Sequence, residues 1–273
     1  MLKRRILTAI ALLVPLIAAL YLLPTIWLLP LFGLVVFAAA KEWAALIGLR
    51  GTASTIYAVV LTAAGGALSA MILNKPSLIW PVLVLAALWW LWALLELGRD
   101  HGLYYGRGTK VVAGALVLLP MWAGAVVLHA ADPLGPLALL FVLVLVWVAD
   151  SLAYFAGKTF GRTKLAPRVS PGKTVEGVLG ALVGVMLMAY FCGTILWQLD
   201  GMRLAGWMLL AVVVTLVSVL GDLSESKVKR VAGVKDSGTL LPGHGGVLDR
   251  IDALTSAIPV FALGWLLLLD IPL

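Results

Sequence analysis

The stretch ILTAIALLVPLIAALYLLPTIWLLPLFGLVVFAAA, residues 6–40, contains no charged side chain. As one α-helix it would be roughly 50 Å long, whereas one crossing of a hydrocarbon layer of about 30 Å takes about 20 residues. Pro24 lies near its middle and offers a turn. The stretch therefore predicts two membrane spans joined at Pro24.

The composition of the whole chain indicates the same class of protein. The 273 residues are 63% hydrophobic and 12% charged, which excludes an ordinary soluble domain. Seven further apolar segments are each close to the length of one crossing. They cover approximately residues 53–73, 78–97, 111–129, 137–156, 175–197, 204–221 and 253–269. We predict an all-α, polytopic integral membrane protein with about nine transmembrane helices.

The positions of the basic residues predict the topology. If the amino terminus is cytoplasmic, only Lys75 and Arg203 of the 20 Lys and Arg residues fall outside. The positive-inside rule favours this arrangement over its inverse, so we expect the amino terminus in the cytoplasm and the carboxyl terminus outside. This topology and attraction to anionic headgroups explain the net charge of +7, so we infer no nucleic-acid partner.

The chain divides unevenly at about residue 132. Residues 1–132 form an N-terminal transmembrane region of about five helices with short loops. Residues 133–273 contain the two largest cytoplasmic segments, 157–174 and 222–252, and we expect the chemistry there. A cleaved signal peptide over residues 3–20 is an alternative for the first span. The single cysteine, Cys192, allows no internal disulfide and no thiolate metal cluster.

An acidic residue interrupts one of the predicted spans. Asp150 lies in VWVADSLAYFAGK, with Tyr154 and Gly157 at i+4 and i+7 on the same helical face. Ionisable groups at membrane depth are costly and usually line a polar cavity. We predict a functional role for Asp150, with a buried structural hydrogen bond as the alternative.

The segment GKTFGRTKLAPRVSPGKTVEG, residues 157–177, has five basic residues and suits a phosphate-rich ligand. Ser170 followed by Pro171 resembles a helix start. Its PGKT is not a Walker A loop, because Pro167 stands where that loop needs a glycine. A merely solvated, positive-inside loop is the alternative.

Three aspartates flank the second charged segment. Asp222 closes the predicted eighth span, and Asp249 and Asp252, three residues apart, open the ninth on one helical face. Asp222 with Glu225 or Ser226, three or four residues later, repeats this arrangement on the preceding helix. Carboxylate oxygens suit Mg²⁺, which binds few carboxylates and shares its other positions with water and substrate phosphates.

The sequence GHGG, residues 243–246, lies between these acids. Glycine lacks a Cβ, so its amides can approach an anion closely, and the next helix start adds its positive dipole. A simple glycine turn is the alternative. Three roles are open for His244: a hydrogen-bond donor to phosphate, a general acid, or only a loop residue. Basic residues that could stabilise a departing pyrophosphate are Lys229, Arg230, Lys235 and Arg250.

The segment from Ser226 to Asp252 resembles the signature of the phosphatidate cytidylyltransferases. The matching positions are Ser226, Lys229, Arg230, Lys235, Asp236, Gly238, Pro242, His244, Gly245, Gly246, Asp249, Arg250 and Asp252. The upstream family pattern matches at Asp150, Tyr154, Gly157, Lys158, Ser170, Pro171, Lys173, Thr174, Glu176 and Gly177. Together they cover about residues 150–252. Nearer the amino terminus the resemblance is weak and rests on the pair Glu42 and Trp43.

The resemblance implies an enzyme that joins CTP and phosphatidate into CDP-diacylglycerol and pyrophosphate at a cytoplasmic, Mg²⁺-dependent site. It also implies a bacterial inner membrane, a homodimer and a second, monovalent cation. Its metal-holding aspartates correspond to Asp222 and Asp249. We predict as catalytic residues Asp150, Lys173, Lys229, Arg230, Lys235, Asp236, His244, Arg250 and Asp252. We predict as substrate-binding residues Tyr154, Lys158, Ser170, Thr174, Glu176, Ser226, Gly245 and Gly246.

Two other functions stay open at the level of the residues. One is an ion-coupled transporter, although transport places ionisable groups near the bilayer midplane, and the predicted seventh, eighth and ninth spans lack charge at their centres. The other is a related CTP-using enzyme acting on another lipid, because an apolar tail pocket leaves no readable sequence code.

Overall fold

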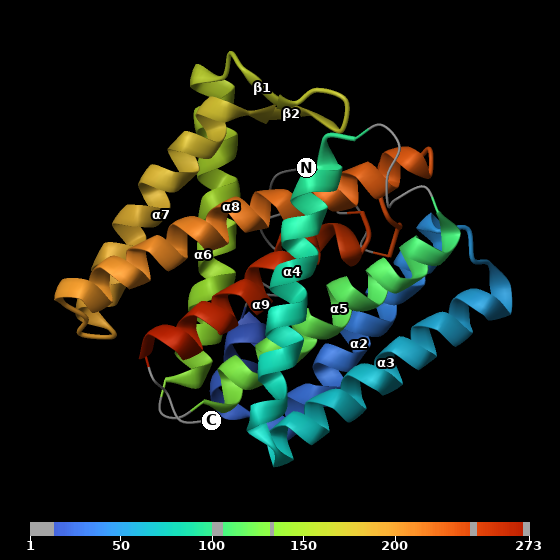
Figure 1. The fold of residues 1–273 in the computed structure, drawn as a ribbon, viewed down its shortest axis with the longest axis horizontal. Helices are drawn as coiled ribbons and strands as arrows, with labels where there is room; N and C mark the ends of the chain where they lie inside the picture. Colours follow the sequence, from blue (N-terminus) through green and yellow to red (C-terminus); the bar gives the residue numbers. More distant parts are fainter. Residues whose placement is uncertain (1–13, 100–105, 132–133, 241–244, 270–273) are drawn as a thin grey trace.

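The computed structural model describes residues 14–99, 106–131, 134–240 and 245–269. Eight helices in this part are long and apolar enough to cross a membrane (Figure 1). The long helices are α2 (Thr25–Leu46), α3 (Gly51–Asn74), α4 (Ile79–Leu97), α5 (Arg107–Ala130), α6 (Gly135–Phe160), α7 (Val175–Ile195), α8 (Gly201–Val231) and α9 (Leu248–Leu269). A 3-10 turn, η1 (Pro76–Leu78), precedes α4.

The predicted spans are confirmed for these eight helices, and the break at Pro24 is confirmed as well. Residues 14–22 are helical, the chain turns at Pro24, and α2 begins at Thr25. Pro24 ends the first helix because its ring fixes φ and its nitrogen cannot donate a helical hydrogen bond. The first residues of the predicted first span lie outside the described part.

The end of α8 differs from the prediction. The predicted eighth span stops at Gly221, with Asp222 at its end, but α8 continues for ten more residues to Val231. Glu225 and Lys229 lie one turn apart and form an ion pair, and both side chains are buried against neighbouring helices. Packing therefore keeps this charged segment helical as far as Val231.

The start of α7 also differs. The predicted helix start at Ser170 is wrong, because residues Ser170–Thr174 form a strand, β2, that pairs antiparallel with β1 (Lys164–Ala166). Thr174 is the N-cap, and its Oγ1 accepts a hydrogen bond of 3.1 Å from Gly177 N. Figure 1 shows this hairpin where α6 ends and α7 begins.

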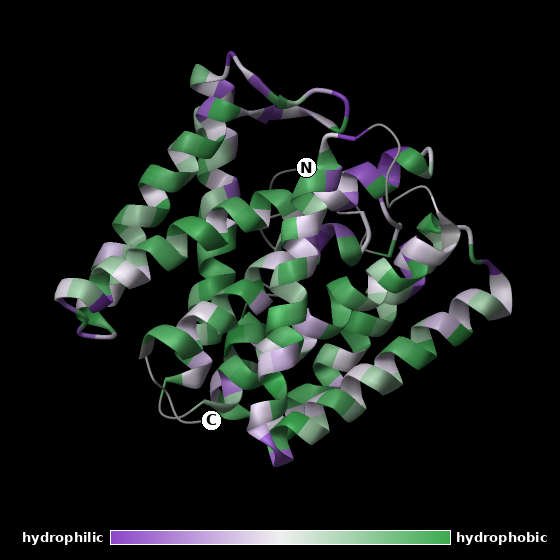
Figure 2. Cartoon of the chain, viewed as in Figure 1, coloured by the Kyte–Doolittle hydropathy of each residue, from purple (hydrophilic) through white to green (hydrophobic). Residues whose placement is uncertain are grey.

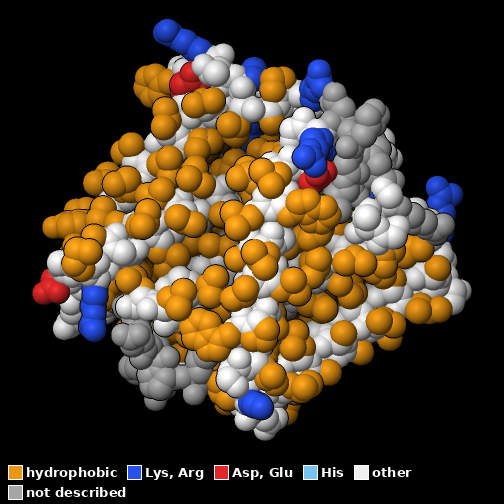
Figure 3. Space-filling model, viewed as in Figure 1, with side chains coloured by type: hydrophobic (Ala, Val, Ile, Leu, Met, Phe, Trp, Pro, Cys, Tyr) orange, Lys and Arg blue, Asp and Glu red, His pale blue; other side chains and the backbone are white. Residues whose placement is uncertain are grey.

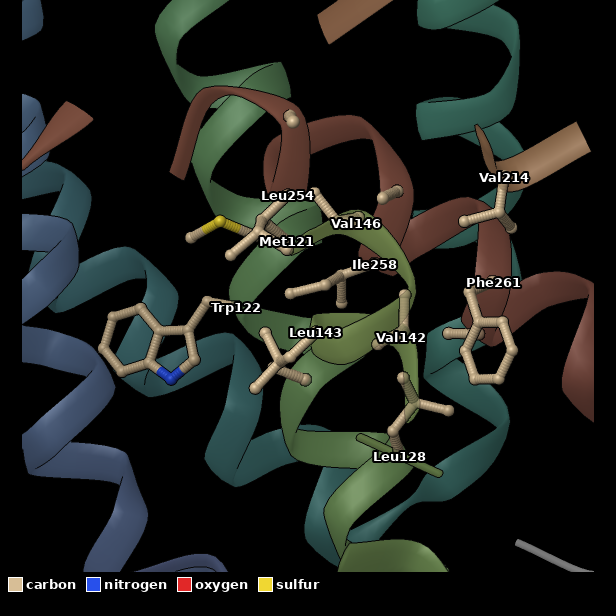
Figure 4. Close-up of a cluster of buried hydrophobic side chains, with 14 of the residues drawn as sticks. Met121, Trp122, Leu128, Val142, Leu143, Val146, Val214, Leu254, Ile258 and Phe261 are labelled. Atoms are coloured by element: carbon tan, nitrogen blue, oxygen red, sulfur yellow. The ribbon is translucent and has the colours of Figure 1, made fainter. Parts of the chain in front are cut away.

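The buried core includes residues of all eight long helices, and one part of it lies where α5, α6, α8 and α9 meet. In Figure 4, Trp122 of α5, Val142 of α6, Val214 of α8 and Phe261 of α9 belong to one buried cluster. Burial of this kind packs the helices side by side and fixes the positions of their ends. Those ends carry the polar residues discussed below.

Small residues allow α8 and α9 to cross closely. A Cβ built on Gly221 would lie 2.8 Å from the backbone oxygen of Asp252 and would also contact Ser256 Oγ. Close backbone approach at a glycine is the usual device for packing membrane helices. This crossing sets Asp222, one residue later, beside the first turns of α9.

We expect Gly221→Ala to lower stability by about 1–3 kcal/mol, because the added methyl group cannot fit without moving α9. Thermal unfolding in detergent measures this loss. Gly108→Ala is the matched control, since a Cβ at that helical glycine meets nothing within 4 Å. Equal melting temperatures for the two variants would contradict the proposed close crossing.

Polar residues gather at one end of the helices. In Figure 2 hydrophilic colour is concentrated on the hairpin and on the neighbouring end of α8, while most other helical surface is hydrophobic. Figure 3 shows the corresponding apolar surface, with Lys and Arg mainly at its margins. This distribution is typical of a membrane protein with one polar face.

Candidate active site

The final turns of α8 carry a row of polar side chains. Asp222, Glu225, Ser226 and Lys229 recur at three- and four-residue intervals, so they share one face of the helix. Ser226 Oγ donates a hydrogen bond of 3.2 Å to Asp222 Oδ1. The row faces the start of α9, which brings Asp249 into contact with it.

Lys229 connects two acids from different helices. Its Nζ donates to Asp249 Oδ1 at 2.7 Å and lies 3.1 Å from Glu225 Oε1. The second contact is an ion pair without hydrogen-bond geometry, and neither carboxylate oxygen of Glu225 has a hydrogen-bond partner. The three side chains are only 4–10% exposed, so their charges interact strongly. Lys229 therefore places one positive charge between two acidic side chains at this end of the helices.

Asp249 also organises the turn before α9. Its Oδ2 accepts hydrogen bonds from Ser237 N at 2.9 Å and from Gly246 N at 2.8 Å. Gly245 has a φ of 79°, a conformation that favours glycine and that allows this tight turn. The amide of Gly246, predicted to bind substrate, thus has an intramolecular partner in this structure.

Acids from three helices meet beside this group. Lys173 Nζ, on β2, lies 2.6 Å from Asp222 Oδ2. Asp150 of α6 and Asp252 of α9 lie close enough to Asp222 for their carboxyl groups to interact electrostatically with it. We call these seven residues the charged cluster: Asp150, Lys173, Asp222, Glu225, Lys229, Asp249 and Asp252. The cluster joins α6, β2, α8 and α9.

The two predicted motif segments meet at the charged cluster. Besides the contact between Lys173 and Asp222, Arg230 Nε donates a hydrogen bond of 3.3 Å to Val169 O in the hairpin. Segments separated by about 60 residues therefore form one polar site.

Other predicted residues have local structural partners. Thr174 is the N-cap of α7. Glu176 accepts hydrogen bonds of 3.1 Å from the amides of Arg162 and Thr163, and these bonds hold the hairpin against α7. Lys158 Nζ lies 5.8 Å from the ring centroid of Tyr154, a cation–π contact. Ser170 begins β2. Exposed residues are Asp150, Tyr154, Lys158, Arg230, Lys235, Asp236 and Arg250. His244 lies outside the described residues.

Two residues without a predicted role connect the signature segment to other helices. Lys227 Nζ donates to the backbone oxygens of Glu96, Leu97 and Arg99 and so caps the end of α4. Glu42 of α2 accepts hydrogen bonds from the segment before α9. The available signal for Glu42 was an acidic residue close to a long apolar run.

The acidic side chains fit a hard cation by their chemistry. Within the described ranges, no group of three or more His, Cys, Asp and Glu side chains is arranged to hold a metal ion. Asp222 and Asp249 instead each pair with a lysine ammonium. Carboxylate oxygens in small number are the protein ligands that Mg²⁺ prefers.

The helical bundle and the charged cluster define a polytopic membrane protein with an ionic site at one end of its helices. The chain belongs to the cytidylyltransferase family, whose sequence model matches residues 3–268. It is 44% identical to a phosphatidate cytidylyltransferase of Pseudomonas aeruginosa, over 96% of both chains. It is 36% identical to one of Haemophilus influenzae, over 96% of this chain and 98% of the other. A Thermotoga maritima relative of the same name is 44% identical over 44% of this chain and 46% of its own.

Proposed function

We propose that the chain is a phosphatidate cytidylyltransferase, which transfers CMP from CTP to phosphatidate and forms CDP-diacylglycerol and pyrophosphate. Similarity over nearly the full length to relatives with that name carries the proposal. The charged cluster supports it, because its two lysines can contact the phosphates of a lipid and of a nucleoside triphosphate, and its carboxylates can hold the metal ion that such phosphates need.

The residues suit attack by a phosphate monoester on the α-phosphorus of CTP. The lipid phosphate is already an anion, so no strong base is needed, and positioning with charge neutralisation carries the reaction. Lys173, Lys229, Arg230 and Arg250 are proposed to neutralise the substrate phosphates. We propose that residues 133–273 supply the groups that contact substrate.

Asp222 and Asp249 are proposed to hold Mg²⁺, which would neutralise phosphate charge when bound. In this structure Lys173 forms an ion pair with Asp222, and Lys229 forms one with Asp249. If these carboxylates held a metal ion, the ammonium groups of Lys173 and Lys229 would be available to contact phosphate oxygens. The other substrate contacts predicted from the sequence remain part of the proposal.

The active site is proposed to face the cytoplasm of a bacterial inner membrane, in a homodimer. The distribution of Lys and Arg supports this orientation, since only Lys75 and Arg203 are assigned to the outside. The lipid phosphate would then enter from the cytoplasmic leaflet. CTP, the second substrate, would come from the same side.

The test is pyrophosphate release by the purified protein in detergent with phosphatidate, Mg²⁺ and each of the four nucleoside triphosphates. Of the four nucleotides, we expect only CTP to give release, and only when phosphatidate is present. CDP-lipid should form in an amount equal to the pyrophosphate. Pyrophosphate release without lipid would contradict the proposal. So would CDP-lipid formation with another lipid acceptor but not with phosphatidate. Ion or solute flux into liposomes without CTP incorporation would support the transporter instead.

A further inference from the structure

A buried carboxylate from the N-terminal half of the chain holds the turn before α9. Glu42 lies near the end of α2 and is 9% exposed. Its Oε1 accepts a hydrogen bond of 3.0 Å from Val247 N, and its Oε2 accepts one of 2.8 Å from Leu248 N. Ser237 Oγ donates a third, of 2.9 Å, to Oε2. About 200 residues of chain separate Glu42 from these donors.

These hydrogen bonds satisfy amides that a helix leaves unpaired. The first amides of α9 have no acceptor within the helix, and a carboxylate beside them also interacts favourably with the helix dipole. A cap of this kind normally comes from the residue just before the helix. Here it comes from α2, so the start of α9 is tied to a different part of the bundle.

The same turn holds Asp249. Ser237 contributes its hydroxyl to Glu42 and its amide to Asp249. Gly246, whose amide donates to Asp249, packs so closely on Glu42 that a Cβ would overlap the carboxylate. A Cβ on Gly238 would overlap it too. Glu42 and Asp249 therefore share Ser237 and Gly246 as contacts, and movement of Glu42 would move the groups that orient Asp249.

We propose that Glu42 is a positioning residue for the reaction: it fixes Ser237 and residues 246–248 so that Asp249 is correctly oriented. A buried carboxylate is costly unless it is hydrogen-bonded, and these donors compensate for its burial. This inference rests on the proposed function, which places Asp249 at the reacting phosphates. It also gives the N-terminal region a role in the site.

Glu42→Gln tests the proposal with little change in shape. The amide has one acceptor oxygen where the carboxylate has two, and its NH₂ group faces backbone donors. We expect the amides of Val247 and Leu248 to exchange with solvent roughly tenfold faster, as for a locally opened turn. We expect kcat/KM for CTP to fall by about 10- to 100-fold, the usual effect of losing a group that orients a ligand residue.

The Mg²⁺ concentration for half-maximal activity gives an independent readout. It should rise in Glu42→Gln, whereas Tyr57→Phe should leave it unchanged. Tyr57→Phe is the matched control because it removes one partly buried hydrogen bond, from Tyr57 Oη to Val111 O at 3.0 Å, in the same N-terminal region. Equal effects of the two variants on stability and on the Mg²⁺ requirement would reduce Glu42 to a structural role and overturn the proposal.

A double-mutant cycle separates this inference from the function on which it rests. Ser237→Ala removes one donor to Glu42, and its effect on amide exchange should be non-additive with that of Glu42→Gln. Exchange is measured without substrate, so it reports on the turn whatever the reaction. Unchanged exchange in Glu42→Gln overturns the anchoring by Glu42. Faster exchange in a protein without cytidylyltransferase activity supports the anchoring but contradicts the proposed function.

Discussion

Replacing Asp249 with asparagine is expected to lower kcat by about a thousandfold or more while the protein stays folded. The change removes the charge that pairs with Lys229 and that is proposed to bind Mg²⁺. Loss of one preorganised electrostatic group at a reacting centre lowers turnover by about 10²- to 10³-fold, and loss of a metal ligand adds to this. Radiolabelled CTP incorporation into CDP-lipid measures the effect.

The fold should survive Asp249→Asn, because the amide oxygen can still accept a hydrogen bond from Ser237 N or Gly246 N. An unchanged gel-filtration profile in detergent would confirm this. Lys75→Gln is the control, since Lys75 is exposed after the end of α3 and should leave activity intact. Normal CDP-lipid synthesis by Asp249→Asn would refute the assignment of Asp249 to the metal.

Lys229→Met is expected to destabilise the protein by about 3–5 kcal/mol, the usual effect of removing one partner from a buried ion pair. Methionine fills a similar volume but leaves the charges of Glu225 and Asp249 unbalanced. Glu225 suffers most, because both of its oxygens lack hydrogen bonds. Thermal unfolding in detergent measures the loss.

A second substitution distinguishes unbalanced charge from lost packing. Adding Glu225→Gln to Lys229→Met removes one of the two uncompensated carboxylates, so it should restore part of the lost stability. Activity should not return, because Lys229 is also proposed to bind phosphate. If the double variant were less stable than Lys229→Met alone, buried charge would not be the cause.

The membrane spans were predictable from the sequence because the bilayer imposes a local rule. A helix must satisfy its own backbone and present apolar side chains over about 20 residues, so composition and length alone identify it. Pro24 is equally local, because its ring ends the helix wherever it lies. These features needed no knowledge of neighbouring helices.

The polar ends of the helices were predicted less well. The charged residues after Gly221 looked like a loop, yet the chain stays helical to Val231 because α4 and α9 bury this segment. Ser170 and Pro171 looked like a helix start, yet they pair with β1 in a hairpin. Tertiary packing changed both outcomes, and a local pattern contains no information about it.

By itself, the sequence determined the class of membrane protein, the positions of the spans, and the presence of acids and bases around residues 150, 173, 222 and 249. The catalytic and metal roles of these residues are still predictions. Only the tertiary structure decided which charges pair, as Lys173 does with Asp222 and Lys229 with both Glu225 and Asp249. It also decided that Glu42 and Lys227 serve distant helix ends. The reason is that spans follow from each segment's own contact with lipid, whereas ion pairs and caps depend on helix crossings between segments far apart in the chain.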